Sequence, residues 1–248
     1  MKTTAERHDD ETVALRALAR LRVGQREALA HFAQDPWDFL CKGVYTIDQV
    51  KGGWTGSLAE ATASGDEPTG RILPFIAPEE RGESYLHALT DAWMEHALLA
   101  VPKSRRMRAS WWGIAAHYWL ARFRPGTKIA FVSRKEGRSE SEGSAELVWR
   151  AKFIHEHIPP GLLPPIDVEY KFCRMALGNG SEIIGIGQGA DQLRQLTLTA
   201  VLGDEVAFWE HAKEFYAASK PTIEGGGRLT LISSAYPGFF EQICHDTF

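Results

Sequence analysis

Apolar and polar positions alternate along the chain in blocks, and these blocks predict its secondary structure. Short apolar runs predict strands at 98–102, 128–133, 182–187, 198–203 and 228–233. Longer segments between these runs predict helices at 110–123, 139–157 and 206–219. Because strands that alternate with helices form mostly parallel sheets, we expect an α/β fold in which a central sheet is flanked by helices.

The part of the chain before residue 71 is less regular. Apolar residues recur at helical spacing over 11–34 and predict a helix with one apolar face, formed by Ala14, Leu18, Leu21, Ala28 and Phe32. Residues 51–70 are rich in Gly, Ser, Thr and Ala, which is typical of a mobile loop or linker. We therefore expect an N-terminal helical extension and loop over 1–70 and the main domain over 71–248.

Three further elements are predicted beside this alternation. Residues 71–76 form a short strand, and Pro78-Glu79-Glu80 opens a helix that runs to about Ala97, because proline and acidic residues favour a helix start. Residues 168–176 form another strand. It leads into a hairpin across Gly178-Asn179-Gly180, since Asn-Gly between extended segments is a strong turn signal.

The composition is that of a soluble globular protein. The chain has 248 residues, of which 44% are hydrophobic and 24% are charged. No apolar run is long enough to cross a bilayer, and the polar N-terminus does not resemble a signal peptide. Cys41, Cys173 and Cys244 are odd in number and scattered, which suits a reducing cytosol and indicates neither a disulfide framework nor a zinc site.

Charge is more informative locally than overall. The net charge of −4 gives no general indication of nucleic-acid binding. Basic residues nevertheless cluster, first over 103–108 and then at Arg122, Arg124, Lys128, Arg134, Lys135 and Arg138. A basic face of this kind can bind phosphates, and an ordinary solvated surface is the alternative explanation.

Two segments about a hundred residues apart carry candidate chemistry. The first is 103–110, which follows the apolar run 98–101; a strand that leads through a basic loop into a helix is the layout of a phosphate-binding loop. The second is the apolar strand that ends in Asp204 and Glu205, which is the layout of the partner segment that holds magnesium and water. Together they predict a P-loop ATPase.

The phosphate loop departs from the standard pattern G-x-x-x-x-G-K-[ST]. With Ser110 at the last position, Ala109 stands in place of the lysine, and Arg108 and Lys103 stand in place of the glycines. The chemistry needs a cation near the β- and γ-phosphates but not at one fixed position. Lys103 can supply that cation from the start of the loop.

This displaced lysine resembles the deviant Walker A loop of the large terminase subunits of tailed bacteriophages. The likeness rests on Val101-Pro102-Lys103-Ser104-Arg105-Arg106-Met107 and on Ser110-Trp111. Further motifs follow in that family's order and spacing, namely Asn179-Gly180-Ser181, Asp191-Gln192-Leu193-Arg194, Gly203-Asp204-Glu205-Val206-Ala207-Phe208-Trp209 and Ile232-Ser233-Ser234-Ala235-Tyr236-Pro237-Gly238. The resemblance covers roughly residues 70–240 and implies a P-loop NTPase fold of the ASCE type.

The resemblance implies how the nucleotide is held. Lys103 contacts the phosphates, and backbone amides surround them from Ser104, Arg105, Arg106, Met107, Arg108 and Ala109. Ser110 and Asp204 hold Mg²⁺. Glu205 orients and activates the attacking water, because that role needs a carboxylate beside the γ-phosphate.

The resemblance also implies residues that assist and transmit hydrolysis. Arg194, ten residues before Asp204, matches a proposed arginine finger, which stabilises charge on the transferred phosphoryl group. A finger that acts from a neighbouring subunit is favoured over one that acts within the same chain, which stays open, and an ordinary salt-bridged surface arginine is the alternative explanation. Ser233 and Ser234 match a coupling motif, in which a hydroxyl senses the γ-phosphate and passes its loss to the parts that grip DNA.

Two positions depart from the family's pattern. Arg108 stands where the family usually has Gly, and a positive φ there would cost about 1–2 kcal/mol. The adenine-contacting Gln is not evident, which leaves the preference for ATP open; Tyr85 could stack on a base instead. Arg105 and Arg106 either bind phosphate or DNA or pair with carboxylates.

The leading interpretation is the ATPase motor domain of a packaging terminase in the cytoplasm of a host bacterium. Its implied partners are double-stranded DNA, the portal protein, the small terminase subunit and further copies in a ring on the procapsid. The family's C-terminal nuclease domain is expected to be absent, and no nuclease activity is expected. The alternatives are a helicase-like P-loop ATPase and a DNA-binding or assembly module that no longer binds nucleotide.

Overall fold

The computed structural model describes residues 23–48, 71–82, 84–133, 142–188, 192–193 and 195–245. Several predictions lie outside these residues: the start of the helix over 11–34, the loop over 51–70, and the side chains of Arg134, Lys135, Arg138 and Arg194. Within the described part of the chain, no helix is long and apolar enough to span a membrane.

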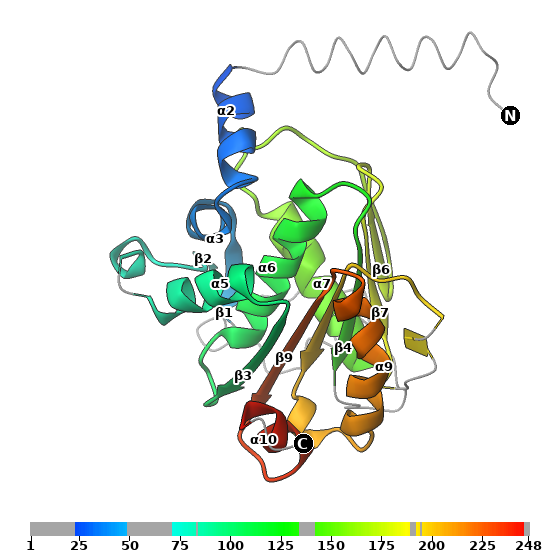
Figure 1. Ribbon diagram of the computed structural model, residues 1–248. Helices are drawn as coiled ribbons and strands as arrows, with labels where there is room; N and C mark the ends of the chain where they lie inside the picture. Colours follow the sequence, from blue (N-terminus) through cyan, green and yellow to red (C-terminus); the bar gives the residue numbers. More distant parts are fainter. Residues whose placement is uncertain are drawn as a thin grey trace, which may run out of the picture.

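A seven-stranded sheet forms the centre of the molecule (Figure 1). Its strands lie in the order β3-β9-β8-β4-β7-β6-β5. The first five are parallel, with bounds β3 Leu98–Lys103, β9 Arg228–Ser234, β8 Ala200–Asp204, β4 Lys128–Ser133 and β7 Glu182–Ile186. The last two are antiparallel, with bounds β6 Arg174–Leu177 and β5 Val168–Lys171. This arrangement confirms the predicted α/β fold class with a mostly parallel central sheet, and β9 lies between β3 and β8.

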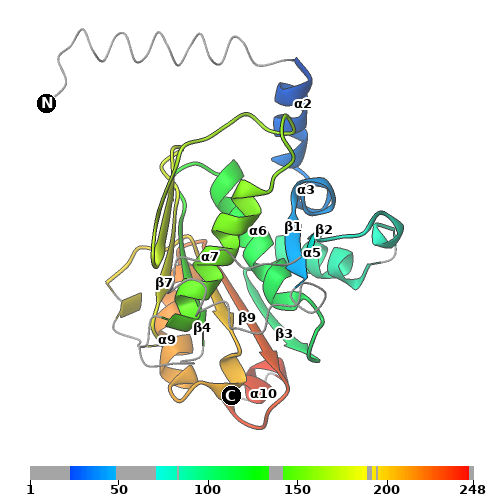
Figure 2. The same cartoon turned by 180° about the vertical axis from the view of Figure 1, so that it is seen from behind.

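Helices cover both faces of this sheet (Figures 1 and 2). On one face α6 (Ala109–Phe123) and α7 (Glu142–Glu156) bury alternate strand residues such as Ile129 and Phe131. On the other face α9 (Ala212–Glu224) and α10 (Phe239–Cys244) bury the intervening residues, such as Ala130 and Val132. This two-sided burial explains why the parallel strands are continuous apolar runs in the sequence.

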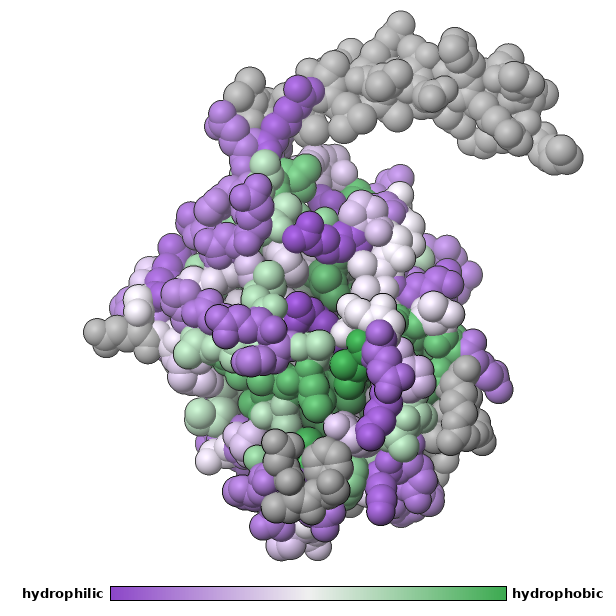
Figure 3. Space-filling model, viewed as in Figure 1, coloured by the Kyte–Doolittle hydropathy of each residue, from purple (hydrophilic) through white to green (hydrophobic). Residues whose placement is uncertain are grey.

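The edge of the sheet is formed by β3, which leads into the predicted phosphate loop. Its residues Leu98, Leu99 and Ala100 are only half-buried. Hydrophobic residues accordingly reach the surface across the middle of the face drawn in Figure 3. The loop is therefore attached to a strand that has a hydrogen-bonded neighbour on one side only within the described sheet.

The N-terminal part packs against α6 rather than standing apart from it. Helix α2 (Val23–Phe32) is followed by α3 (Pro36–Gly43), which Asp35 caps by accepting a hydrogen bond from the Asp38 amide at 2.8 Å. Phe39 is fully buried, with its ring centroid 5.2 Å from that of Phe123. Strand β1 (Tyr45–Asp48) then pairs antiparallel with β2 (Arg71–Pro74).

Two predicted elements are each divided in the structure. The predicted helix 206–219 is instead the short 3₁₀ helix η2 (Val206–Phe208) followed by α9, because the Trp209 backbone is extended and its indole donates to the Asp204 carbonyl at 3.1 Å. The predicted strand 168–176 is divided into β5 and β6 by a turn. The hairpin across Gly178-Asn179-Gly180 is confirmed, and it joins β6 to β7.

The helix predicted from Pro78 is also divided. Pro78–Glu80 forms the 3₁₀ helix η1, and the α-helix α5 spans Tyr85–Glu95. Ser84 starts α5 by accepting a hydrogen bond from the Leu86 amide at 3.3 Å. Pro78 therefore begins only a short 3₁₀ turn. The α-helix begins after Ser84, whose capping role the prediction did not consider.

Cys41, Cys173 and Cys244 all lie in the described part of the chain and form no disulfide there. Cys41 is buried in α3, and burial raises the pKa of its thiol to about 11. A thiol with such a pKa is neutral and unreactive at physiological pH.

His117 lies fully buried in α6 between the rings of Trp93 and Phe131. Its Nδ1 lies 2.7 Å from the Gly113 carbonyl oxygen, which can only accept, so Nδ1 carries the proton of the neutral ring. Its Nε2 has no hydrogen-bond partner among the described residues. Burial lowers the pKa of His117 from 6.5 to about 4.

We expect His117 to make folding stability sensitive to acid. The unfolded chain binds a proton at His117 below about pH 6.5, whereas the folded chain resists it until about pH 4. The free energy of unfolding should therefore fall by about 3 kcal/mol from this residue alone between these values. Denaturant titrations of the wild type and His117→Gln at several pH values measure how the free energy of unfolding depends on pH in each protein. Identical pH dependence in both proteins would contradict the assignment.

Gly185 of β7 lies directly beneath the start of α7. A Cβ at this position would lie 2.9 Å from the Ser144 carbonyl oxygen, which is a backbone atom that cannot rotate away. We expect Gly185→Ala to lower the free energy of unfolding by about 1–3 kcal/mol. Gly24→Ala on α2 is the control, because a Cβ there meets nothing within 4 Å and should be neutral or slightly stabilising.

Candidate active site

The predicted site residues lie together at the carboxyl ends of β3, β8 and β9. The parallel register pairs Lys103 with Ser234 and Asp204 with Ile232, so these residues lie in adjacent rows at that end of the sheet. Loops that follow parallel strands converge there, and α/β proteins usually bind ligands at this place. Residues that are a hundred positions apart in the sequence therefore become neighbours.

The loop from Ser104 to Arg108 joins β3 to α6. Its residues Ser104 to Met107 are exposed. Arg106 and Arg108 have φ values of 63° and 54°, which are left-handed conformations that favour glycine. The expected positive φ at Arg108 is thus present, at a cost of about 1–2 kcal/mol.

Side-chain contacts hold this strained loop in place. The Arg108 guanidinium donates to the Phe75 carbonyl at 2.7 Å and to the Glu80 carboxylate at 2.8 Å. The hydrogen bond from Arg108 lowers the pKa of Glu80 below its ordinary value. The Tyr85 hydroxyl donates to the Met107 carbonyl. The loop is therefore fastened to the segment that precedes α5, and Tyr85 contacts its backbone.

Lys103 is the last residue of β3 and points inward. Its side chain is only 9% exposed. The Nζ atom donates to Glu205 Oε1 at 2.7 Å and to Ser234 Oγ at 3.3 Å. The displaced lysine therefore lies beside the predicted water-activating carboxylate.

Glu205 follows β8 in a left-handed conformation, with φ of 55°. The Ser234 amide donates to its Oε2 at 3.2 Å, and the Ser233 hydroxyl lies 3.5 Å from the same oxygen. Burial acts to raise the pKa of Glu205, but hydrogen bonds from Lys103 and Ser234 outweigh it and lower that pKa below its ordinary value. The carboxylate is therefore ionised at neutral pH.

Asp204 is the last residue of β8 and is 8% exposed. Ser110 Oγ donates to its Oδ1 at 2.9 Å. Burial raises the pKa of Asp204, while the positive charge of Arg150 and the Ser110 hydrogen bond oppose the rise. A hydroxyl and a carboxylate oxygen in contact are the hard ligands that Mg²⁺ prefers, so this pair fits a magnesium ion.

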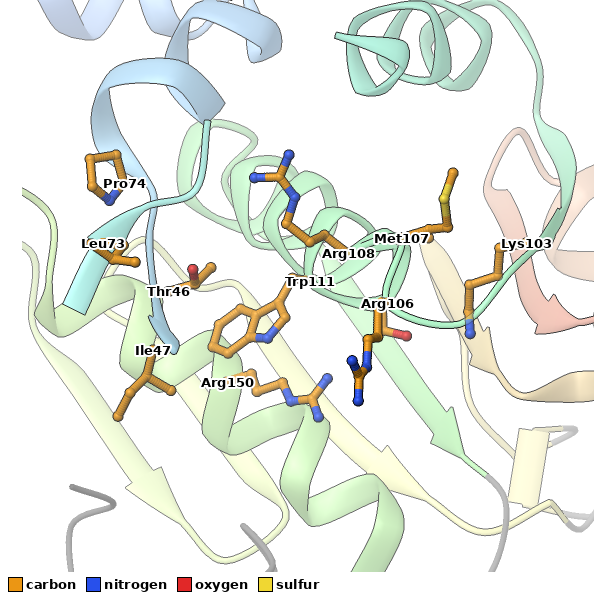
Figure 4. Close-up of a pocket in the computed structure, with 12 residues that line it drawn as sticks. Thr46, Ile47, Leu73, Pro74, Lys103, Arg106, Met107, Arg108, Trp111 and Arg150 are labelled. Carbon is orange, nitrogen blue, oxygen red and sulfur yellow. The ribbon is translucent and has the colours of Figure 1, made fainter. Parts of the chain in front are cut away.

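A cavity of about 590 Å³ opens beside the loop (Figure 4). Lys103, Arg106 and Ser110 line one side of it. The β1–β2 ribbon forms the facing wall, with Thr46, Ile47, Leu73 and Pro74. Trp111 and Arg150 complete the lining.

The sequence did not predict this ribbon wall or Arg150. The ribbon pairs Asp48 with Arg71, and no local pattern indicates a pairing across the intervening residues. The sequence does hold one signal for Arg150, which is a basic residue placed between the apolar residues Val148 and Ala151. The structure shows that both of these are buried in the core. Arg194 lies outside the described residues, so its position as an arginine finger stays a prediction.

No protein-family model matches the chain, and no curated protein matches it. Among solved structures, the large terminase ATPase domain of Thermus phage P74-26 is 18% identical over 62% of this chain and 66% of that chain, with a TM-score of 0.48. A mutant of the same phage domain is 17% identical over 62% of this chain and 67% of that one, with the same TM-score of 0.48. The large terminase of the thermophilic bacteriophage D6E in complex with ADP is 11% identical over 63% of this chain, with a TM-score of 0.44. The chain spans only 36% of the length of that D6E protein.

The conformation of Arg108 predicts an unusual order of stability between two variants. Arg108→Ala and Arg108→Gly both lose the contacts with Phe75 and Glu80, but only glycine adopts φ of 54° without strain. We expect Arg108→Gly to be more stable than Arg108→Ala by about 1 kcal/mol in thermal or denaturant unfolding. In an ordinary helical position the order would be reversed, and that result would contradict the left-handed loop.

Proposed function

We propose that this chain is the ATPase motor domain of a viral large terminase subunit, which hydrolyses ATP to move double-stranded DNA into a procapsid. One observation carries the proposal. A lysine, a serine hydroxyl and two carboxylates converge at the strand ends, with Lys103 2.7 Å from Glu205 and Ser110 2.9 Å from Asp204. This is the set of groups that phosphoryl transfer from a nucleotide requires.

The phosphate chain of ATP lies along the 104–108 loop in this proposal. Backbone amides at the start of α6 point toward bound anions, and the helix dipole adds a partial positive charge. Lys103 turns from Glu205 to the β- and γ-phosphates. Arg106, which lines the same cavity, adds a second cation at its rim.

Ser110 and Asp204 hold the magnesium ion in this proposal. When bound, Mg²⁺ neutralises charge that develops on the phosphate oxygens. The Ser110–Asp204 hydrogen bond already places the two ligand oxygens side by side. Ser110 then gives its lone pair rather than its proton to the site, and the carboxylate of Asp204 is the second ligand.

Glu205 acts as the base. It orients a water molecule whose oxygen bonds to the γ-phosphorus, while the bond from that phosphorus to the bridging oxygen of ADP breaks. The water proton passes to the Glu205 carboxylate, which is ionised because its hydrogen bonds lower its pKa. Ser234 keeps this carboxylate in position after Lys103 has left it.

Ser233 and Ser234 couple the site to β9. Ser234 contacts both Lys103 and Glu205, so a change at either residue reaches the end of β9 directly. The segment that follows contains Tyr236, which packs on Phe208 with ring centroids 5.1 Å apart. We infer that loss of the γ-phosphate moves this segment and, through it, the DNA.

The proposed motor works as a homo-oligomeric ring on the portal protein, together with the small terminase subunit, in the cytoplasm of a host bacterium. Arg194 of one subunit then completes the site of its neighbour. The basic residues 103–108 leave more cations than one nucleotide needs, which supports transient contact with DNA phosphates. A chain that has lost nucleotide binding and serves only in assembly is the competing function.

Magnesium-dependent ATP binding and turnover test the proposal. We expect Lys103→Ala to abolish ATP binding in calorimetry, since it removes the cation that contacts the phosphates. Glu205→Gln should keep binding and lower turnover at least ~10²-fold, as expected when a general base is removed. Lys171→Ala is the matched control, because this exposed lysine pairs with Glu169 at the far edge of the sheet.

Other outcomes would redirect the assignment. Equal ATP binding by wild type and Lys103→Ala would show that another cation contacts the phosphates, namely Arg105, Arg106 or Arg108. Absence of ATP binding in every protein, wild type included, would contradict the motor function and favour the assembly module.

A further inference from the structure

Arg150 is a cation of the cavity that the roles described above do not use. It lies on α7, which packs beside α6, and its side chain is 18% exposed. It lines the same cavity as Lys103 and Ser110. Figure 4 shows the side chain extending past Trp111 toward the side of the loop on which Arg106 lies. The cavity therefore has a basic group on a second helix, opposite the phosphate loop.

Two neighbours fix the direction of this side chain. One guanidinium nitrogen forms an ion pair with Glu146, one turn earlier on α7. The guanidinium also lies over the Trp111 ring, 5.3 Å from its centroid. Because Trp111 directly follows Ser110, the contact ties Arg150 to the first turn of α6, where the phosphate loop ends.

The ion pair with Glu146 does not satisfy the whole guanidinium. Its Nε is buried and has no hydrogen-bond partner among the described residues. A buried donor without a partner destabilises the protein, and at the wall of a cavity a ligand is one partner that can satisfy it. Arginine has five N–H donors in a planar fork, which can serve a carboxylate and a phosphate at the same time.

We propose that Arg150 binds the phosphate chain of the nucleotide from within the same chain, as a second clamp opposite Lys103. This inference rests on the proposed ATPase function. Each subunit then carries its own arginine at the phosphates, in addition to any arginine that a neighbour supplies. A single subunit should therefore bind the triphosphate of ATP before a ring assembles.

Arg150→Met tests the contact, because methionine keeps apolar packing on Trp111 and removes the charge. We expect Arg150→Met to weaken binding of Mg-ATP to the monomer by about 10–100-fold, from the loss of charge-assisted hydrogen bonds. Inorganic triphosphate should lose affinity by a similar factor, because the contact is made to phosphate. Arg150→Lys should lose less, since it keeps the charge without the fork.

Two controls separate a phosphate contact from a structural role. Glu146→Gln removes the ion pair and leaves the guanidinium, so it should keep or increase ATP affinity. Lys152→Ala removes a cation of α7 that forms the equivalent ion pair with Glu156, and it should not change binding. Thermal unfolding of each variant identifies any loss of fold.

The results distinguish this inference from the function on which it rests. Wild-type affinity in a folded Arg150→Met, while Lys103→Ala has lost binding, would overturn the inference alone. Equal losses in Glu146→Gln and Arg150→Met would also overturn it, because the ion pair would then be what matters. Absence of ATP and triphosphate binding in the wild type would overturn both.

Discussion

The ion pair between Lys103 and Glu205 joins two strands that are not neighbours in the sheet. Lys103 ends β3 and Glu205 follows β8, while β9 lies between them and contributes Ser234 to both partners. Three strand ends are thus held together by one carboxylate and one ammonium group. The Lys103 side chain is only 9% exposed, so its charge would be destabilising without a partner, and Glu205 supplies that partner.

The same pair makes the site responsive to its ligand. The charges of Lys103 and Glu205 neutralise each other while no anion is near. A triphosphate offers the lysine a more strongly charged partner, and the carboxylate then faces water with only the Ser233 and Ser234 hydrogen bonds to hold it. The arrival of substrate and the release of the base are therefore one event in the proposed function. In that function, the arrangement would limit premature activation of water.

Much of this arrangement was predictable because its signals are local or periodic. Continuous apolar runs identified the parallel strands, and Ser110, Asp204 and Glu205 followed from their positions at strand or loop ends. The errors came from interactions across the fold. The indole of Trp209 ends η2 through the Asp204 carbonyl, and β1 pairs with β2 across residues distant in sequence. The role inferred for Arg150 depends on the contact between α6 and α7, which no single segment encodes.

The cavity has two walls with separate origins in the chain. The phosphate loop and the carboxylates belong to the parallel sheet, whereas the facing wall is the β1–β2 ribbon, a sheet of its own. Substitutions at Thr46, Ile47 or Leu73 need not disturb Lys103, Asp204 or Glu205. Evolution can therefore change the shape of the cavity on the ribbon wall while the groups proposed for hydrolysis stay constant on the other wall. The two walls can vary independently of each other.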